Sequence, residues 1–361
     1  MTMQAKYGIL LMLLLTFSCA SAQKITRVNA IKANNYGVIY ALPKTSFEVT
    51  LVVKKTTYHR GEFYPYAQRY LGIDNPIIEN ETRFTLENVL VANKGIADKE
   101  NSFMVEFRGK TVEPFVYLRE DGVILTINAE TMEEAPVEEF KLPEKSAPLV
   151  NPRRFLSQET LMAGSTAKQA ELIARQVFDL RRNRSDILSG EAVNMPPDGN
   201  AYKMVMEEID MQEKALTELF SGSVESEYFT VSYTLIPGKE DINGEVIARF
   251  SGKLGPVDAD NLAGEPVRIT LTNKTPAVQL LLNEKELKQL ENKLSEGIVY
   301  NVPGKADLVI EFQNKVLFNK EVDVVQYGSQ DVLARRMFEN QKQPIQVHFH
   351  SELGAIKQII Q

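Results

Sequence analysis

The chain is poor in the residues that most often carry metal or thiol chemistry. It has one Cys, three His and no Trp among 361 residues. A single Cys cannot form an intrachain disulfide and leaves no thiolate set for a structural zinc ion. Three His leave few bases for a Ser-His-Asp triad. The composition therefore argues against a disulfide scaffold, and we expect no bound cofactor.

Several nucleotide and nucleophile motifs are also missing. The sequence contains no G-x-G-x-x-G, no G-x-x-x-x-G-K-[ST] and no G-x-S-x-G. Acidic residues outnumber basic ones, 48 to 41, so no basic excess attracts a nucleic acid. Hydrophobic residues make up 43% of the chain, which is enough to build packed cores rather than a disordered chain.

The first 22 residues have the three regions of a secretory signal peptide. Lys6 is followed by the apolar run Ile9 to Leu15, and the small residues Ala20, Ser21 and Ala22 come after it. The uncharged stretch is shorter than the ~20 residues that a membrane-spanning helix needs. We predict cleavage after Ala22, export to the periplasm or outer membrane, and no transmembrane segment in the mature chain.

Cys19 provides an alternative processing site. A Cys just after an apolar run is the lipid-bearing residue of bacterial lipoproteins. Ser18 fits such a signal, but Thr16 stands where Leu is usual. Cleavage after Ala22 instead leaves a mature protein without any Cys.

The fold class predicted is α+β and mostly β, with two antiparallel β-sandwich-like domains and a central helical hairpin. Asp121-Gly122 between two apolar β-prone runs is a strong hairpin signal. Apolar residues spaced by three and four predict helices from Thr166 to Arg184, capped by Ser165, and from Gly199 to Phe220.

The composition divides the chain into five parts. After the signal peptide, residues 1–22, we expect an N-terminal β domain over 23–129 and a linker rich in Pro and Glu over 130–152. The helical hairpin is expected over 153–222. A C-terminal β domain with one short helix, Asn283 to Ser295, is expected over 223–361.

An aromatic segment is the first candidate binding site. Tyr rings combine an apolar face with a polar rim, which suits stacking on a sugar or anchoring a protein partner. The alternative is a short helix, Pro65 to Leu71, that packs its rings against a sheet. The five aromatic residues are Tyr58, Phe63, Tyr64, Tyr66 and Tyr70.

His348 and His350 form a weaker candidate, for a metal site. On a strand, a spacing of two places both imidazoles on one face. Zn²⁺ or Cu²⁺ would need a third ligand, such as Glu352 or His59. The alternative is two half-exposed His on a terminal strand, with Phe349 in the core.

Carboxylates supply the remaining chemistry that the sequence suggests. A hydrolase needs two carboxyl groups across a cleft with separated pKa values, and Glu62, Glu106 and Glu120 are candidates for such groups. Adjacent carboxylates in the sequence do not establish that geometry, so no catalytic residue is assigned.

Three stretches together resemble a known family. They are Gly37 to Thr45 with Gly61 to Gly72, then Pro197 to Gly222, and Gly297 to Pro303 with Gln326-Tyr327-Gly328. In this order they resemble an exported Bacteroidetes family of unknown function (domain of unknown function 4831), over about 37–359. The resemblance implies export but no activity, cofactor or catalytic residue. Leu333-Ala334 departs from the Leu-Pro that often follows the family's Gln-x-Gly, so that turn is expected to differ.

Export, β-rich patterning and the missing cofactor motifs favour a non-enzymatic binding or structural module of the cell envelope. Its expected partner is an envelope protein or a glycan, without nucleic acid, and the oligomeric state stays open. The alternative is a secreted hydrolase that acts on glycan or peptide through carboxylates.

Overall fold

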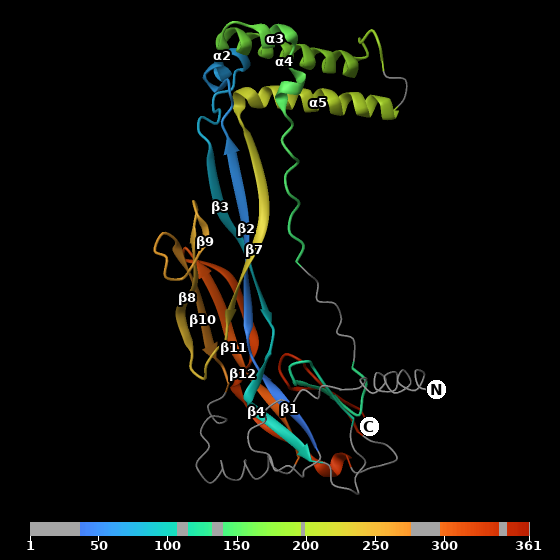
Figure 1. The fold of residues 1–361 in the computed structure, drawn as a ribbon, viewed down its shortest axis with the longest axis vertical. Coiled ribbons are helices and arrows are strands. Elements are labelled where there is room, and N and C mark those ends of the chain that lie inside the picture. The colour runs from blue at the N-terminus through green and yellow to red at the C-terminus, as the bar shows by residue number, and fades with distance from the viewer. Residues whose placement is uncertain are drawn as a thin grey trace, which may run out of the picture.

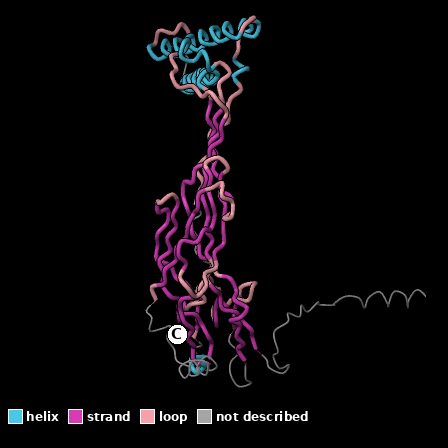
Figure 2. The backbone as a smooth tube through the Cα atoms, turned by 90° about the vertical axis from the view of Figure 1, so that its left-hand side faces the viewer, coloured by secondary structure: helices cyan, strands magenta, loops and turns pink. Residues whose placement is uncertain are grey.

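The structure, a computed structural model, describes residues 37–106, 115–131, 140–195, 199–275, 297–338 and 345–360. The molecule is elongated, with the long helices at one end and β-sheets over the rest of its length (Figures 1 and 2). The strands are β1 Gly37–Lys44, β2 Phe47–His59, β3 Glu81–Asn93, β4 Ile96–Glu106, β5 Val116–Leu118, β6 Ile124–Ile127, β7 Ser223–Leu235, β8 Ile242–Ser251, β9 Gly255–Val257, β10 Glu265–Asn273, β11 Gly297–Phe312, β12 Lys315–Ala334, β13 Gln346–Phe349 and β14 Ile356–Ile360. The prediction of a mostly β chain with antiparallel sheets is confirmed.

A three-stranded sheet of order β3-β2-β7 runs from the β end to the helices, and we call it the ribbon. Strand β2 pairs with β7 through thirteen residues and with β3 through twelve. In β2 the residues Phe47, Val49, Leu51 and Val53 are buried, because alternate side chains of a strand face the same side. The ribbon therefore begins in a core and ends at the helices.

A five-stranded sheet of order β12-β11-β10-β8-β9 packs against the lower half of the ribbon. Its buried residues form one hydrophobic cluster with those of β2, β3 and β7. The shared members include Val49 and Leu51 from the ribbon and Ile269, Leu308 and Ile310 from the larger sheet. Face-to-face packing of two sheets buries both apolar faces at once.

The shared cluster crosses the domain boundaries expected from the sequence. Strand β7 lies after the helices in the sequence, in the expected C-terminal domain, yet it pairs along its whole length with β2 of the expected N-terminal domain. The two β segments therefore share a sheet and a core. Periodicity within each segment predicts strands but carries no information about which strands pair.

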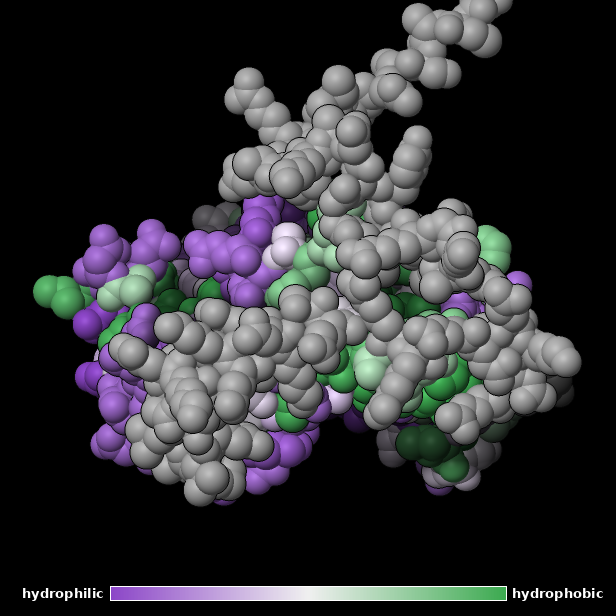
Figure 3. All heavy atoms as spheres, turned by 90° about the horizontal axis from the view of Figure 1, so that it is seen from below, coloured by the Kyte–Doolittle hydropathy of each residue, from purple (hydrophilic) through white to green (hydrophobic). Residues whose placement is uncertain are grey.

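A second core lies at the end opposite the helices. It combines the pair β1–β4 and the sheet β14-β13-β6-β5 with the ends of β11 and β12. Tyr40, Leu42, Ile124, Ile127 and Val347 are among its buried members. Viewed from this end, most of the hydrophilic residues in sight lie on the left and most of the hydrophobic ones on the right (Figure 3).

The helical end contains two long helices, α4 (Thr166–Ser189) and α5 (Gly199–Ser221), and the shorter α2 (Ala67–Leu71) and α3 (Gln158–Met162). Ser165 caps α4 as expected, since its hydroxyl accepts a hydrogen bond from the Lys168 N–H at 3.2 Å. The apolar faces of α4 and α5 meet in a third buried cluster. No helix in the described part of the chain is long and apolar enough to cross a membrane.

The segment 140–151 has no helix or strand and runs beside the ribbon toward the helical end (Figure 1). Ser146 ties it to the β7 edge, where its N–H donates to the Ser226 carbonyl at 3.0 Å. The expected signal peptide, including Cys19, and the expected helix Asn283 to Ser295 lie outside the described residues.

Candidate functional site

The aromatic segment lies at the joint between the ribbon and the helices. A 3-10 helix, Tyr64–Tyr66, leads into α2. Phe63 is buried, and its ring centroid lies 5.8 Å from that of Phe220 on α5. Tyr66 and Tyr70 stack at 5.9 Å and pack against the cluster formed by α4 and α5. The short helix predicted for this segment is therefore present, but it packs against helices rather than a sheet.

Arginine side chains of the same region lie over faces of the tyrosine rings. The Arg60 guanidinium lies 5.5 Å from the Tyr64 ring centroid, and Arg69 lies 5.4 Å from that of Tyr70. On the ribbon, Arg83 covers Tyr58 at 5.4 Å. Cation–π contacts of this length stabilise the rings in place. Tyr64 is half-buried at this joint, and its ring is not part of the apolar cluster between α4 and α5.

Two glycines allow backbone segments to approach each other closely at this joint. A Cβ on Gly61 would lie 2.7 Å from the Leu219 carbonyl oxygen, and one on Gly222 would lie 2.5 Å from the His59 carbonyl oxygen. Gly222 also has a φ of +78°, which side chains other than glycine rarely adopt. The chain can therefore turn from α5 into β7 directly against the end of β2.

A polar cleft of about 640 Å³ opens beside α5, where α4 and β7 approach it. Glu213 lies in it, with its side chain 13% exposed. It accepts from Arg181 Nε at 2.7 Å and pairs with Arg184 Nη1 at 2.9 Å. Arg184 also binds Asp210 at 3.0 Å. These pairs join α4 to α5 and line the cleft with both signs of charge.

Glu218 is the carboxyl of this cleft that burial affects most clearly. Desolvation raises its pKa above the ordinary value, and the Lys214 ammonium, 3.9 Å away, lowers it in part. The buried hydroxyl of the neighbouring Thr217 has no hydrogen-bond partner among the described residues. Sequence patterns did not single out Glu218, because the burial of one helix residue depends on the elements that pack beside it.

Large apolar side chains are exposed on the helices. Phe178 is 50% exposed and Leu188 is 63% exposed on α4, although α4 also has a fully buried face. Scattered exposed apolar residues are ordinary on a surface, but several on one small end of a molecule are typical of contact surfaces. The others on the helices and their connections are Leu161, Met162, Val193, Met195, Met204 and Val205.

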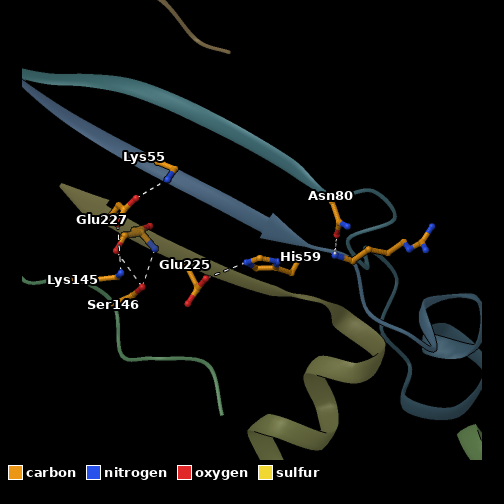
Figure 4. Close-up of polar contacts among 9 residues, drawn as sticks. Lys55, His59, Asn80, Lys145, Ser146, Glu225 and Glu227 are labelled. Atoms are coloured by element: carbon orange, nitrogen blue, oxygen red, sulfur yellow. Dashed lines mark hydrogen bonds and ion pairs between the residues drawn. The ribbon is translucent and has the colours of Figure 1, made fainter. Parts of the chain in front are cut away.

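Ion pairs lie along the half of the ribbon that is nearer the helices (Figure 4). Glu227 on β7 binds Lys55 at 2.7 Å and Lys145 of the neighbouring segment at 3.5 Å. His59 pairs with Glu225 at 3.1 Å, and the Arg60 N–H donates to Asn80 Oδ1 at 2.7 Å. These contacts occupy His59 within the ribbon, far from β13.

Among the described residues, the structure does not bring three of the candidate metal ligands together. His348 is buried on β13, so the expectation of two half-exposed His is wrong for it, whereas Phe349 is buried in the core as expected. His350 follows the strand, with Nδ1 3.7 Å from Glu352 Oε1. The described residues contain no group of three His, Cys, Asp or Glu placed to hold a metal ion.

The carboxylates suggested for hydrolysis are likewise scattered. Glu62 is exposed beside the joint, whereas Glu120 is exposed at the turn between β5 and β6. The side chain of Glu106 lies outside the described residues.

A family model matches residues 36–357, and its description is Domain of unknown function (DUF4831). The chain belongs to this family. The match covers nearly all of the described strands and helices, so the resemblance based on three sequence stretches is confirmed. No curated protein and no solved structure was found to match the chain.

Several residues that carry the family resemblance hold distant segments together. Gln326 donates through Nε2 to the Thr45 carbonyl at 2.9 Å and accepts through Oε1 from the Thr45 N–H at 3.1 Å. Tyr327 is buried and donates to the Glu240 carbonyl at 2.8 Å. A Cβ on Gly328 would lie 1.9 Å from the Val302 carbonyl oxygen. The Gln-Tyr-Gly run therefore has a structural role in this chain.

Proposed function

We propose that this chain is an exported protein of the bacterial cell envelope, a non-enzymatic binding or structural module. Its helical end contacts a protein or glycan partner. The sequence supports export through the leader at residues 1–22, with cleavage after Ala22 or lipidation at Cys19. The shared core of the two sheets supports a β-sandwich-like body as the scaffold.

The observation that carries the proposal is the position of the helices. The ribbon holds them at the far end of the molecule, away from the two β cores (Figure 2). That end exposes apolar side chains such as Phe178 and Leu188 and also carries a cleft lined by both signs of charge. Exposed apolar groups rimmed by polar ones are the usual composition of a contact surface.

Mass spectrometry of the native protein tests export. The mature chain is expected to begin at Gln23, or at Cys19 with attached lipid, and to fractionate with the envelope. A main pool that retains Met1 in the cytosol contradicts the proposal.

Recovery of envelope components by the purified mature chain tests the contact surface. The double substitution Phe178→Ser/Leu188→Ser is expected to reduce recovery several-fold, and Tyr64→Ala tests the aromatic segment separately. Val316→Ser is the matched control, because Val316 is 49% exposed on β12 of the β body. Equal recovery by the helical variants and the control contradicts a contact at the helical end.

The hydrolase alternative is favoured by one observation, the partly buried carboxyl of Glu218 in the polar cleft, whose pKa desolvation raises. A raised pKa suits a general acid. If the cleft is catalytic, Glu218→Gln abolishes release of fragments from isolated cell-wall glycan while Glu207→Gln, on the exposed side of α5, does not. The same activity in both variants excludes the alternative at this site.

A further inference from the structure

A groove of about 670 Å³ lies where the larger sheet ends beside β3. Its volume falls in the range of ordinary ligand sites. The strands that line it meet beside β9 in Figure 1, far from the polar cleft of the helical end. Phe84, Phe250 and Phe312 provide phenyl rings, and the last two meet edge to face at 5.7 Å.

Strand β3 forms one side of this groove and is an edge of the ribbon. Phe84 lies opposite Lys55 of β2, but its N–H points away from β2 and donates to the Gly252 carbonyl at 2.8 Å. Hydrogen-bonding directions alternate along an antiparallel strand up to the bulge at Glu87, so Leu86 also directs its N–H outward.

Within the described residues, no backbone group pairs with Leu86 on that outer side. An edge with unpaired N–H and C=O groups is a template for another strand. The Phe84 N–H is already bonded to the Gly252 carbonyl, so the groups that an added strand can use are the Phe84 C=O and the Leu86 N–H.

We propose that the groove binds an extended peptide segment of a partner protein, which adds a strand to β3 at Phe84 to Leu86. Backbone hydrogen bonds supply affinity, and one apolar side chain of the peptide packs on the phenyl rings. The rim has two carboxylates, Glu87 and Glu265, and one ammonium, Lys315, so basic residues beside the apolar anchor are favoured. This surface is separate from the helical end.

Gly252 offers a way to block the groove without disturbing the fold. A Cβ there would lie 3.9 Å from the outward carbonyl oxygen of Phe84, with no other heavy atom within 4 Å. Valine at this position therefore covers the acceptor that an added strand needs. Gly238 is the matched control, because it is exposed between β7 and β8 and a Cβ there meets nothing within 4 Å.

The test pans a phage-displayed library of random nonapeptides against the mature chain and measures the enriched peptides by fluorescence anisotropy. Peptides with an apolar anchor are expected, and Gly252→Val should weaken their binding about ten-fold, as for the loss of one backbone hydrogen bond. Gly238→Val should leave affinity unchanged. N-methylation at alternate peptide residues, which removes the donors, should abolish binding.

Three results overturn the proposal. One is a library that yields no peptide with preference for the wild type over Gly252→Val. Another is equal affinity of N-methylated and unmodified peptides. The third is dimerisation of the wild-type chain, seen by sedimentation and lost in Gly252→Val, which assigns the edge to a second copy of the chain instead. Circular dichroism of both variants confirms that each is folded.

Discussion

The Tyr40 hydroxyl and the backbone of Val299 form a reciprocal pair. The hydroxyl donates to the Val299 carbonyl at 3.1 Å and accepts from the Val299 N–H at 2.8 Å. Tyr40 is 1% exposed, and burial raises its pKa well above the ordinary value of a tyrosine, although the hydrogen bond with Val299 lowers it slightly. The pair joins β1 to β11, 259 residues apart in the sequence.

Tyr40→Phe is expected to lower the free energy of unfolding by about 1–3 kcal/mol, because it leaves a buried backbone N–H and C=O without their partner. Urea denaturation followed by circular dichroism measures the change. Tyr117→Phe is the control, since Tyr117 is 44% exposed. A loss no greater than that of the control would show that the hydroxyl does not stabilise the fold.

Asn301→Asp is expected to destabilise the end opposite the helices strongly. Asn301 is buried, and its Nδ2 donates to the carbonyls of Pro43 at 2.9 Å and Leu353 at 2.8 Å. A carboxylate cannot donate, so we expect a loss of about 3 kcal/mol or more at pH 7. The loss of unfolding free energy should be smaller in acid, where the protonated carboxyl group can donate one hydrogen bond.

Asn261→Asp is the control for this substitution, because Asn261 is exposed and its Oδ1 accepts from the Ala263 N–H at 3.0 Å. A carboxylate keeps that acceptor. Urea midpoints at pH 4 and pH 7 measure both variants, and similar losses in the two would contradict the role of the buried amide.

Gly222→Ala is expected to loosen the joint between ribbon and helices. Gly222 and Gly190 share a φ of +78°, but a Cβ on Gly190 meets nothing within 4 Å, whereas one on Gly222 meets the His59 carbonyl at 2.5 Å. Gly190→Ala should cost roughly 1–2 kcal/mol for the backbone alone. Gly222→Ala should cost about 1–3 kcal/mol more from crowding.

Limited proteolysis with mapping of the cut sites shows which part of each variant has lost stability. Cleavage within α4 and α5 should accelerate in Gly222→Ala before the β body is cut. Equal cleavage rates in the two alanine variants would mean that the close approach to β2 contributes nothing.

Glu218→Gln is expected to stabilise the protein at pH 7 by less than about 1 kcal/mol, and to have little effect at pH 4. Burial raises the Glu218 pKa, so the folded state binds more protons than the unfolded state between the ordinary and the raised pKa. Stability from this group is therefore present below the ordinary pKa of a glutamate and falls as the pH rises through the raised value. Thermal denaturation across this range measures the effect, and destabilisation at pH 7 would contradict it.

Local patterns in the sequence predicted many elements closely. The turn at Asp121-Gly122 connects β5 and β6. Helix α5 begins at Gly199 as predicted and ends one residue beyond the predicted Phe220. These features depend on neighbouring residues, whose spacing and backbone preferences are visible in the sequence.

Long-range features were not predictable in this way. Strand β11 continues through Pro303, which sits at a register shift between Val302 and Gly304 and so interrupts the pattern that a strand would show. The aromatic segment was predicted as a candidate contact, but which of its rings are covered depends on α4 and α5. Pairing of β7 with β2 is set by packing across 164 or more residues.

The ribbon has a mechanical consequence. Its ladder bonds lie across the strands, so tension between the helices and the β body shears all the pairs of β2 with β3 and β7 together instead of unzipping them one by one. The same arrangement transmits tension from the helices to the β body with little extension of the ribbon. This geometry is therefore better suited to a rigid spacer that bears load than to a flexible linker.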